Sequence, residues 1–173
     1  AFLFSSILLG KSNENEVLKS DLDSLNILTK KSPERAIRFA RELLKKVAPI
    51  SESNFEYKIN NTLGEVFLDL QMYGQAMSHF TEANMIREKL GQGSAPWLLI
   101  NMGNVYYQQQ KYIKAREYYL NGLDKFNSLK HNQDNRVSGR KVALSNLGRI
   151  EVRIKNYDKA LNYFREALDV SKK

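Results

Sequence analysis

The stretch from Met102 to Gly122, MGNVYYQQQKYIKAREYYLNG, decides the fold of this chain because its spacing occurs three times. An apolar residue and a glycine are followed by a tyrosine nine residues after the glycine, an alanine at twelve, an aromatic at sixteen and a small residue at nineteen. The glycines are Gly64, Gly103 and Gly148, and the other places hold Leu63, Met102 and Leu147; Tyr73, Tyr112 and Tyr157; Ala76, Ala115 and Ala160; Phe80, Tyr119 and Phe164; and Ala83, Gly122 and Ala167. Small residues at helical spacing predict pairs of closely packed helices.

The spacing resembles the tetratricopeptide repeat, in which Leu-Gly and an aromatic three residues later lie in a first helix, helix A, and Ala-x3-Phe lies in a second, helix B. Phe67 and Tyr106 occupy the aromatic place, but Glu151 stands there in the third copy, so its packing must differ. The resemblance implies an all-α fold, a right-handed superhelical solenoid of about four antiparallel helix pairs, with a concave surface formed mainly by the A helices. The resemblance also implies that each glycine lies where helix A comes closest to helix B.

A degenerate fourth copy is expected upstream, because Ser32-Pro33 followed by Ala36 is typical of the start of a helix B, with the serine as cap. We predict helix pairs at about 14–30 with 33–48, 53–71 with 73–89, 95–110 with 112–129, and 137–155 with 157–172. The corresponding repeat units span about 14–50, 53–91, 95–130 and 137–173 of one repeat domain, residues 13–173. Turn-forming residues at 90–94 and 131–135 predict the loops between the last three pairs.

Residues 1–12 form an apolar leader, of which the first ten are uncharged. One interpretation is the remnant of an export signal or anchor, which would place the repeats in the periplasm or elsewhere outside the cytoplasm. The other is an apolar strip that caps the repeat array or docks into a neighbouring chain, which is compatible with a location in the cytoplasm. The chain does not begin with methionine, so we expect the numbering to start inside a longer product. No stretch approaches the roughly 20 apolar residues of a membrane-spanning helix.

The residue types argue against catalysis. The 173 residues include no cysteine, which excludes disulfides, thiol nucleophiles and thiolate zinc sites. The two histidines, His79 and His131, have no partner at metal-ligand spacing, and a surface role is expected for both. Gly91-Gln92-Gly93 lacks the preceding strand and third glycine of a phosphate loop and indicates the end of a helix. We therefore expect no enzyme activity, no metal and no cofactor.

The net charge is +8, and much of it comes from the segment Lys130–Lys155. A basic segment favours binding to nucleic acid, anionic lipid or an acidic peptide, although it is also compatible with a solvated helix face. A helical repeat that binds nucleic acid through this segment is therefore one alternative function. Self-association through residues 1–10 or through the terminal helix pair is another.

The resemblance implies a binding site, because ligands of the family usually lie along the A helices. The places that face such ligands hold eight candidate residues. These are Asn61, Glu65, Trp97, Asn104, Tyr107, Gln108, Arg149 and Arg153. The set runs from acidic through aromatic and amide to basic, which suits an extended peptide or a partner protein bound in one direction. Asn104→Ala and Tyr107→Ala are expected to abolish partner capture without unfolding the protein.

Two features qualify this site. Trp97 either anchors an apolar side chain of the ligand or closes its loop against the preceding hairpin. The carboxylate clamp of the chaperone-binding members is not matched, because Glu65 and Val142 occupy clamp places. The function expected is a non-catalytic protein-protein interaction module. The long repeats and apolar leader resemble the tetratricopeptide regions of bacterial sensor kinases and transcription regulators, which implies the sensory or scaffold part of a larger signalling or regulatory protein.

Overall fold

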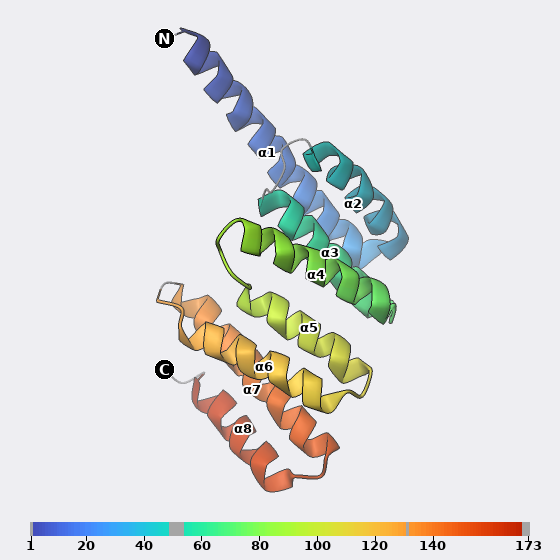
Figure 1. The fold of residues 1–173 in the computed structure, drawn as a ribbon, viewed down its shortest axis with the longest axis vertical. Helices are drawn as coiled ribbons and strands as arrows, with labels where there is room; N and C mark the ends of the chain where they lie inside the picture. Colours follow the sequence, from blue (N-terminus) through green and yellow to red (C-terminus); the bar gives the residue numbers. More distant parts are fainter. Residues whose placement is uncertain (1, 49–53, 131, 171–173) are drawn as a thin grey trace. The chain divides into compact units, whose positions relative to one another are not determined.

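The computed structural model describes the backbone of residues 2–48, 54–130 and 132–170, and the side chains of these ranges from residue 15 onward. The described residues form eight α-helices and no strand, which confirms the all-α prediction (Figure 1). The helices are α1 (Phe2–Lys31), α2 (Pro33–Val47), α3 (Asn54–Asp69), α4 (Tyr73–Lys89), α5 (Pro96–Gln108), α6 (Tyr112–Asn127), α7 (Gln133–Arg153) and α8 (Tyr157–Val170). They fall into two compact units, Ala1–Leu90 (unit 1) and Gly91–Lys173 (unit 2), with two helix pairs each.

Most helix boundaries follow the sequence pattern, and all four B helices begin at the predicted residue. Helix α7 is an exception, because it begins at Gln133 and not near residue 137. Asn132 causes the earlier start: it adopts a left-handed conformation with φ of 61° and its side-chain oxygen accepts a hydrogen bond from the backbone N–H of Asn135 at 3.1 Å. An asparagine in this role satisfies one of the free N–H groups at the start of a helix.

The first helix pair differs from its prediction at two points. Helix α1 begins at Phe2, not near residue 14, so the leader and the first predicted helix form one helix. The side chains of residues 1–14 lie outside the described part, and the two interpretations of the leader are not tested. Ser32 stands at the cap position of α2, as expected, but its side chain forms no capping hydrogen bond.

The turn inside each of the last three helix pairs has the same geometry. Gln71, Gln110 and Lys155 adopt left-handed conformations, with φ of 59°, 60° and 62°. The N–H of the next residue donates to the carbonyl five residues earlier, for example Lys111 to Tyr106 at 2.9 Å. This is a Schellman motif, in which glycine is the usual left-handed residue. The repeat spacing located these turns, but glutamine and lysine give no sequence signal for the left-handed conformation itself.

The repeated glycines make room for an aromatic ring of the same helix pair. A Cβ atom added to Gly103 would lie 2.6 Å from a ring carbon of Tyr119, and one added to Gly148 would lie 2.6 Å from Phe164. A Cβ at Gly64 would meet the ring of Phe80 in the same way. The prediction of a close approach is thus correct, but the atoms that require it belong to the ring sixteen residues later. The spacing of glycine and aromatic in the sequence records this contact.

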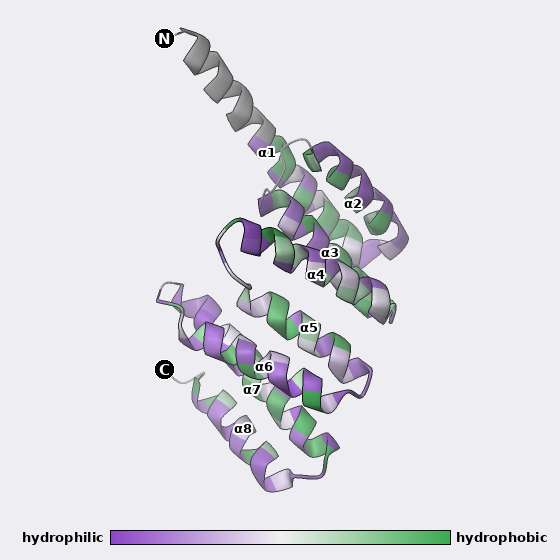
Figure 2. Ribbon diagram, viewed as in Figure 1, coloured by the Kyte–Doolittle hydropathy of each residue, from purple (hydrophilic) through white to green (hydrophobic). Residues whose placement is uncertain are grey.

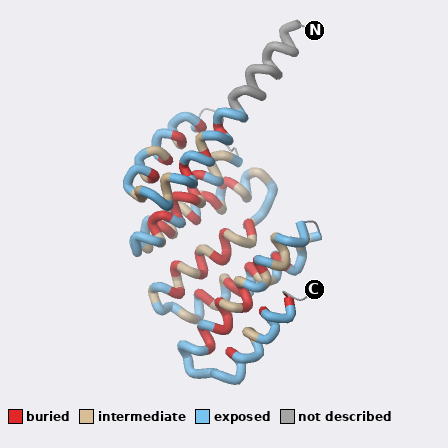
Figure 3. The backbone as a smooth tube through the Cα atoms, turned by 180° about the vertical axis from the view of Figure 1, so that it is seen from behind, coloured by how far each residue is buried: buried red, intermediate tan, exposed pale blue. Residues whose placement is uncertain are grey.

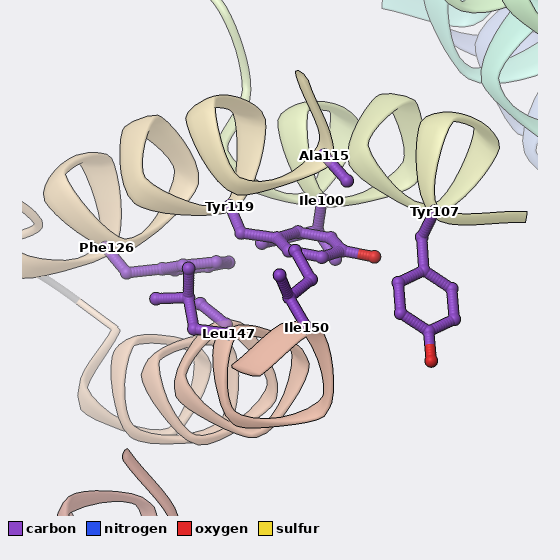
Figure 4. Packing of buried hydrophobic residues seen from close by; sticks show 8 residues of the cluster. Ile100, Tyr107, Ala115, Tyr119, Phe126, Leu147 and Ile150 are labelled. Carbon is purple, nitrogen blue, oxygen red and sulfur yellow. The ribbon is translucent and has the colours of Figure 1, made fainter. Parts of the chain in front are cut away.

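Apolar residues alternate with polar ones along the helices, and the buried faces lie inside each unit (Figures 2 and 3). In unit 1, Leu18, Leu22 and Leu25 of α1 are buried, as are Ala36 and Ala40 of α2. The core of unit 2 is built from α5, α6 and α7 (Figure 4). It contains Ile100, Tyr107, Ala115, Tyr119, Phe126, Ala143, Leu147 and Ile150. Tyr119 and Phe126 have no exposed surface. These rings hold α6 against α7 and so position the A helices of unit 2.

His79 is half-buried and has structural contacts, which corrects the expected surface role. Its ring stacks on Phe67 with ring centroids 5.4 Å apart, and its Nδ1 lies 2.9 Å from Oδ1 of the buried Asn60. Because the amide nitrogen of Asn60 donates to the carbonyl of Glu56, the Asn60 oxygen is left to accept a hydrogen from Nδ1 of His79. His79 therefore ties α4 to α3.

We predict that His79 makes the stability of the protein pH-dependent. Burial lowers the pKa of His79 below its usual value, and Arg41 lowers it further, whereas Glu82 opposes the shift. The unfolded chain therefore binds this proton at a higher pH than the folded chain, and stability should fall as the pH drops through about 6.5. Urea unfolding of the wild type and of His79→Gln on both sides of this pH measures the effect. A stability difference between them that is independent of pH would contradict the prediction.

Candidate functional site

The eight candidate residues are divided between the two units. Asn61 and Glu65 lie on α3 of unit 1, where the amide nitrogen of Asn61 donates to Glu65 Oε1 at 2.8 Å. The other six lie on α5 and α7, the two A helices of unit 2. We use the term A-helix face for the surface of unit 2 formed by Asn104, Tyr107 and Gln108 of α5 with Arg149 and Arg153 of α7.

Tyr107 is the centre of the A-helix face. The Arg149 guanidinium lies over its ring, 4.6 Å from the centroid, and Arg153 Nε donates to its hydroxyl at 3.2 Å. This hydrogen bond raises the pKa of Arg153, so its positive charge is secure. Tyr112, the first residue of α6, lies beside Tyr107 with centroids 5.6 Å apart. Two arginines are thus ordered by one tyrosine that is only 9% exposed.

A pocket of about 220 Å³ opens beside these side chains. It is lined by Tyr107, Gln108, Gln110, Tyr112 and Arg153. The left-handed turn residue Gln110 brings a side-chain amide to the pocket from the loop between α5 and α6. The lining therefore offers a guanidinium, two amides and two phenols, and it contains no carboxylate.

Asn104 has a structural role beside its predicted binding role. Its Oδ1 accepts a hydrogen bond from the Tyr119 hydroxyl at 2.8 Å and a longer one from Asn146 Nδ2 at 3.4 Å. Asn146 Oδ1 in turn accepts from Arg149 Nη1 at 3.2 Å, so a chain of hydrogen bonds joins the buried ring to the arginine. Burial raises the pKa of Tyr119, which keeps its hydroxyl a donor. Asn104→Ala would therefore remove a core hydrogen bond as well as a side chain of the A-helix face.

Trp97 lies near the other end of α5 from the pocket. Its Nε1 donates to Asn135 Oδ1 at 2.6 Å, and its ring packs edge-on against Phe126 with centroids 5.0 Å apart. Trp97 therefore contacts α6 and the start of α7, which belongs to the following helix pair. Neither sequence interpretation, a ligand anchor or a contact with the preceding hairpin, anticipated this. The partner residue lies 38 positions further along the chain, and no spacing rule connects the two.

The charges of the A-helix face are unbalanced. Neither Arg149 nor Arg153 forms an ion pair with a carboxylate of the described residues. The nearby Glu151 is fully buried and is engaged elsewhere, by Arg116 Nη2 at 2.6 Å and by Lys159 Nζ at 3.5 Å. The face therefore carries two positive charges that a ligand can neutralise.

The basic segment is not a single face. Arg136 and Arg140 lie thirteen residues before Arg149 and Arg153 on α7, a separation that places the two pairs about 140° apart around the helix axis. The earlier pair lines a different pocket of about 410 Å³, shared with Glu166 and Asp169 of α8. The charge of this segment is thus distributed over two sides of α7, and one of these sides faces acidic residues of α8.

The described part of the chain contains no group of three or more His, Asp or Glu side chains that could hold a metal ion. No helix there is long and apolar enough to cross a membrane. His131 lies outside the described residues, so its predicted surface role is not tested.

Comparison with known proteins supports the repeat assignment. Residues 94–173 match the family model described as tetratricopeptide repeat, and a search of curated proteins gave no match. The fold is similar to BtubC (BKLC) from P. vanneervenii, at 20% identity and a TM-score of 0.71 over 81% of this chain and 57% of that one. It is also similar to aspartyl phosphate phosphatase F from Bacillus subtilis, at 21% identity and a TM-score of 0.74 over 91% of this chain and 40% of that one. Apo RapI is similar at 19% identity and a TM-score of 0.74 over 98% of this chain and 63% of that one. The chain spans less than two thirds of each of these proteins.

Proposed function

We propose that this chain, whose residues 94–173 match the tetratricopeptide repeat model, is a non-catalytic interaction module that binds a peptide or protein segment on the A-helix face of unit 2. Repeats of this kind serve as binding surfaces, because stacked helix pairs present rows of side chains to a partner. The observation that carries the proposal is the arrangement of Arg149 and Arg153 around Tyr107.

The chemistry of the face selects the partner. Arginines form strong, geometrically defined hydrogen bonds with carboxylates, and here both guanidinium groups are already held by Tyr107 or Asn146. Holding them in advance reduces the conformational entropy lost on binding. The pocket amides of Gln108 and Gln110 can bond a peptide backbone. The ligand proposed is therefore an extended segment with an acidic side chain at the pocket.

A direct binding test compares two double variants that lose the same charge from one helix. Arg149→Ala with Arg153→Ala should weaken binding to an acidic peptide at least about tenfold, because each charge-assisted hydrogen bond contributes about 1.5–3 kcal/mol. Arg136→Ala with Arg140→Ala, on the other side of α7, should leave binding unchanged. The measurement is fluorescence anisotropy with Asp- and Glu-containing peptides and their Asn and Gln counterparts, with thermal melts to check folding.

Other outcomes of this experiment separate the alternatives. Equal loss in the two double variants would show that only total charge matters and would contradict the proposed site. Retention of an oligonucleotide, falling steeply with salt and lost in both variants, would favour the nucleic-acid alternative. Binding that survives both double variants would place the site elsewhere in the chain.

We further propose that this module is the sensory or scaffold part of a larger bacterial signalling or regulatory protein. The likeness in fold to aspartyl phosphate phosphatase F and to RapI supports this. The test is capture of partners from a bacterial lysate, with the Arg149→Ala and Arg153→Ala double variant as reference, followed by mass spectrometry. Specific recovery of proteins with no regulatory role would count against it.

A further inference from the structure

Helix α8 carries an apolar stripe beside the face that packs on α7. Tyr157, Leu161 and Leu168 are 63%, 48% and 61% exposed, and Phe164 is half-buried between them. The spacing of four, three and four residues places all four on one side of the helix. Helix α8 lies at the edge of unit 2, with α7 on its other side (Figures 1 and 3).

The preceding helix pair shows how such a stripe is covered. The same places in α6 hold Tyr112, Arg116, Tyr119 and Leu123, each 45 residues earlier. There α7 packs against α6, so Tyr119 is fully buried and the other three are half-buried. The α8 stripe is therefore the kind of surface that a neighbouring helix covers in this protein. It differs at one place: Leu161 replaces Arg116, so its cover needs no carboxylate and must be apolar.

The charges beside the stripe indicate which helix covers it. Asp158 and Arg165 are both exposed and lie seven residues apart, two turns along the same flank. When two copies of α8 pair antiparallel, with Leu161 of one beside Phe164 of the other, Asp158 of each copy lies near Arg165 of its partner. A parallel pairing holds these opposite charges about two turns apart. Asp158 and Arg165 are thus complementary to the same two residues of another copy in the antiparallel orientation and not in the parallel one.

From this register we infer that two copies of the chain associate through α8, antiparallel and with twofold symmetry. Each copy contributes Tyr157, Leu161, Phe164 and Leu168 to a shared apolar seam, flanked by two symmetric Asp158–Arg165 ion pairs. A twofold interface is isologous, so every contact occurs twice. The four apolar positions follow the alternating three- and four-residue spacing of helices that pack side by side. The arrangement is independent of the A-helix face and its ligand.

Sedimentation velocity of the full chain over a concentration series tests this inference. The wild type should dimerise, and Leu161→Glu should abolish the dimer without changing helicity, because Leu161 is 48% exposed in the single chain. Ile113→Glu is the matched control: Ile113 is 76% exposed on α6 but lies outside the stripe, so the dimer should persist. A monomeric wild type at every concentration, or a dimer that survives Leu161→Glu, would overturn the inference.

Charge reversal tests the orientation. Asp158→Arg alone, or Arg165→Asp alone, turns both ion pairs into repulsions and should weaken the dimer about tenfold. The double variant with both changes restores opposite charges in the antiparallel pairing, and its dissociation constant should return to within about threefold of the wild type. Failure of the double variant to recover would exclude the antiparallel seam. These positions are exposed, so the variants should fold normally.

Discussion

Arg116→Met is expected to lower the free energy of unfolding by about 3 kcal/mol. Arg116 Nη2 lies 2.6 Å from Oε1 of Glu151, which has no exposed surface. Without the arginine, the buried carboxylate keeps only Lys159, which is 3.5 Å away and 48% exposed. Removing one partner of a buried ion pair costs about 3–5 kcal/mol, and the remaining lysine places this case at the lower end. Urea unfolding, followed by circular dichroism, measures the loss.

The compensating change separates the charge effect from a packing effect. Phe67 and Tyr106 occupy the place of Glu151 in the other copies, and Met77 occupies the place of Arg116. A chain with Arg116→Met and Glu151→Leu therefore resembles the earlier copies, and most of the lost stability should return, because apolar residues can replace a buried ion pair without loss. A double variant no more stable than Arg116→Met would show that the arginine acts through packing alone.

Glu151 also shows what the sequence could and could not predict. The register of the three glycines located the third helix pair and showed that Glu151 stands there in place of an aromatic residue. It could do so because the repeat spacing reflects contacts within one pair. The two cations that hold the carboxylate come from α6 and α8, and one of them belongs to the preceding pair. Contacts between pairs depend on how the pairs stack, which no spacing inside one copy specifies.

The candidate site shows the same difference between contacts within a helix pair and contacts between pairs. The repeat register placed Tyr107 and Arg153 on facing A helices, and the structure joins them by a hydrogen bond. The register also assigned Trp97 and Tyr107 to one surface. Trp97 lies ten residues before Tyr107 on α5, however, and its ring packs on Phe126. The left-handed Gln110, which completes the pocket, was missed because glutamine gives no signal for this conformation. The repeat register thus places the candidate residues on the A helices, but contacts between neighbouring pairs decide which of them stay exposed.

Gly103→Ala is expected to destabilise the protein by about 2 kcal/mol, although alanine is the better helix former. The added Cβ would lie 2.6 Å from a Tyr119 ring carbon and 3.2 Å from Cβ of Tyr118. Tyr119 cannot move aside easily, because it is fully buried and its hydroxyl is bonded to Asn104. Overpacking of this kind costs about 1–3 kcal/mol, and we expect the upper end here, partly offset by about 1 kcal/mol of helix propensity. Thermal and urea unfolding measure the net change.

A control and a cycle test the cause of this loss. Gly74→Ala, in the first turn of α4, meets no atom within 4 Å and should stabilise the protein by up to about 1 kcal/mol. Tyr119→Leu removes the ring that the new Cβ would contact. This change also lowers the free energy of unfolding by itself, because it removes buried surface. In that background Gly103→Ala should become neutral or stabilising, so the two changes should be strongly coupled in a double-mutant cycle. Additive effects would mean that the glycine is required by the backbone of α5 and not by the ring, and the same explanation would then fail for Gly64 and Gly148.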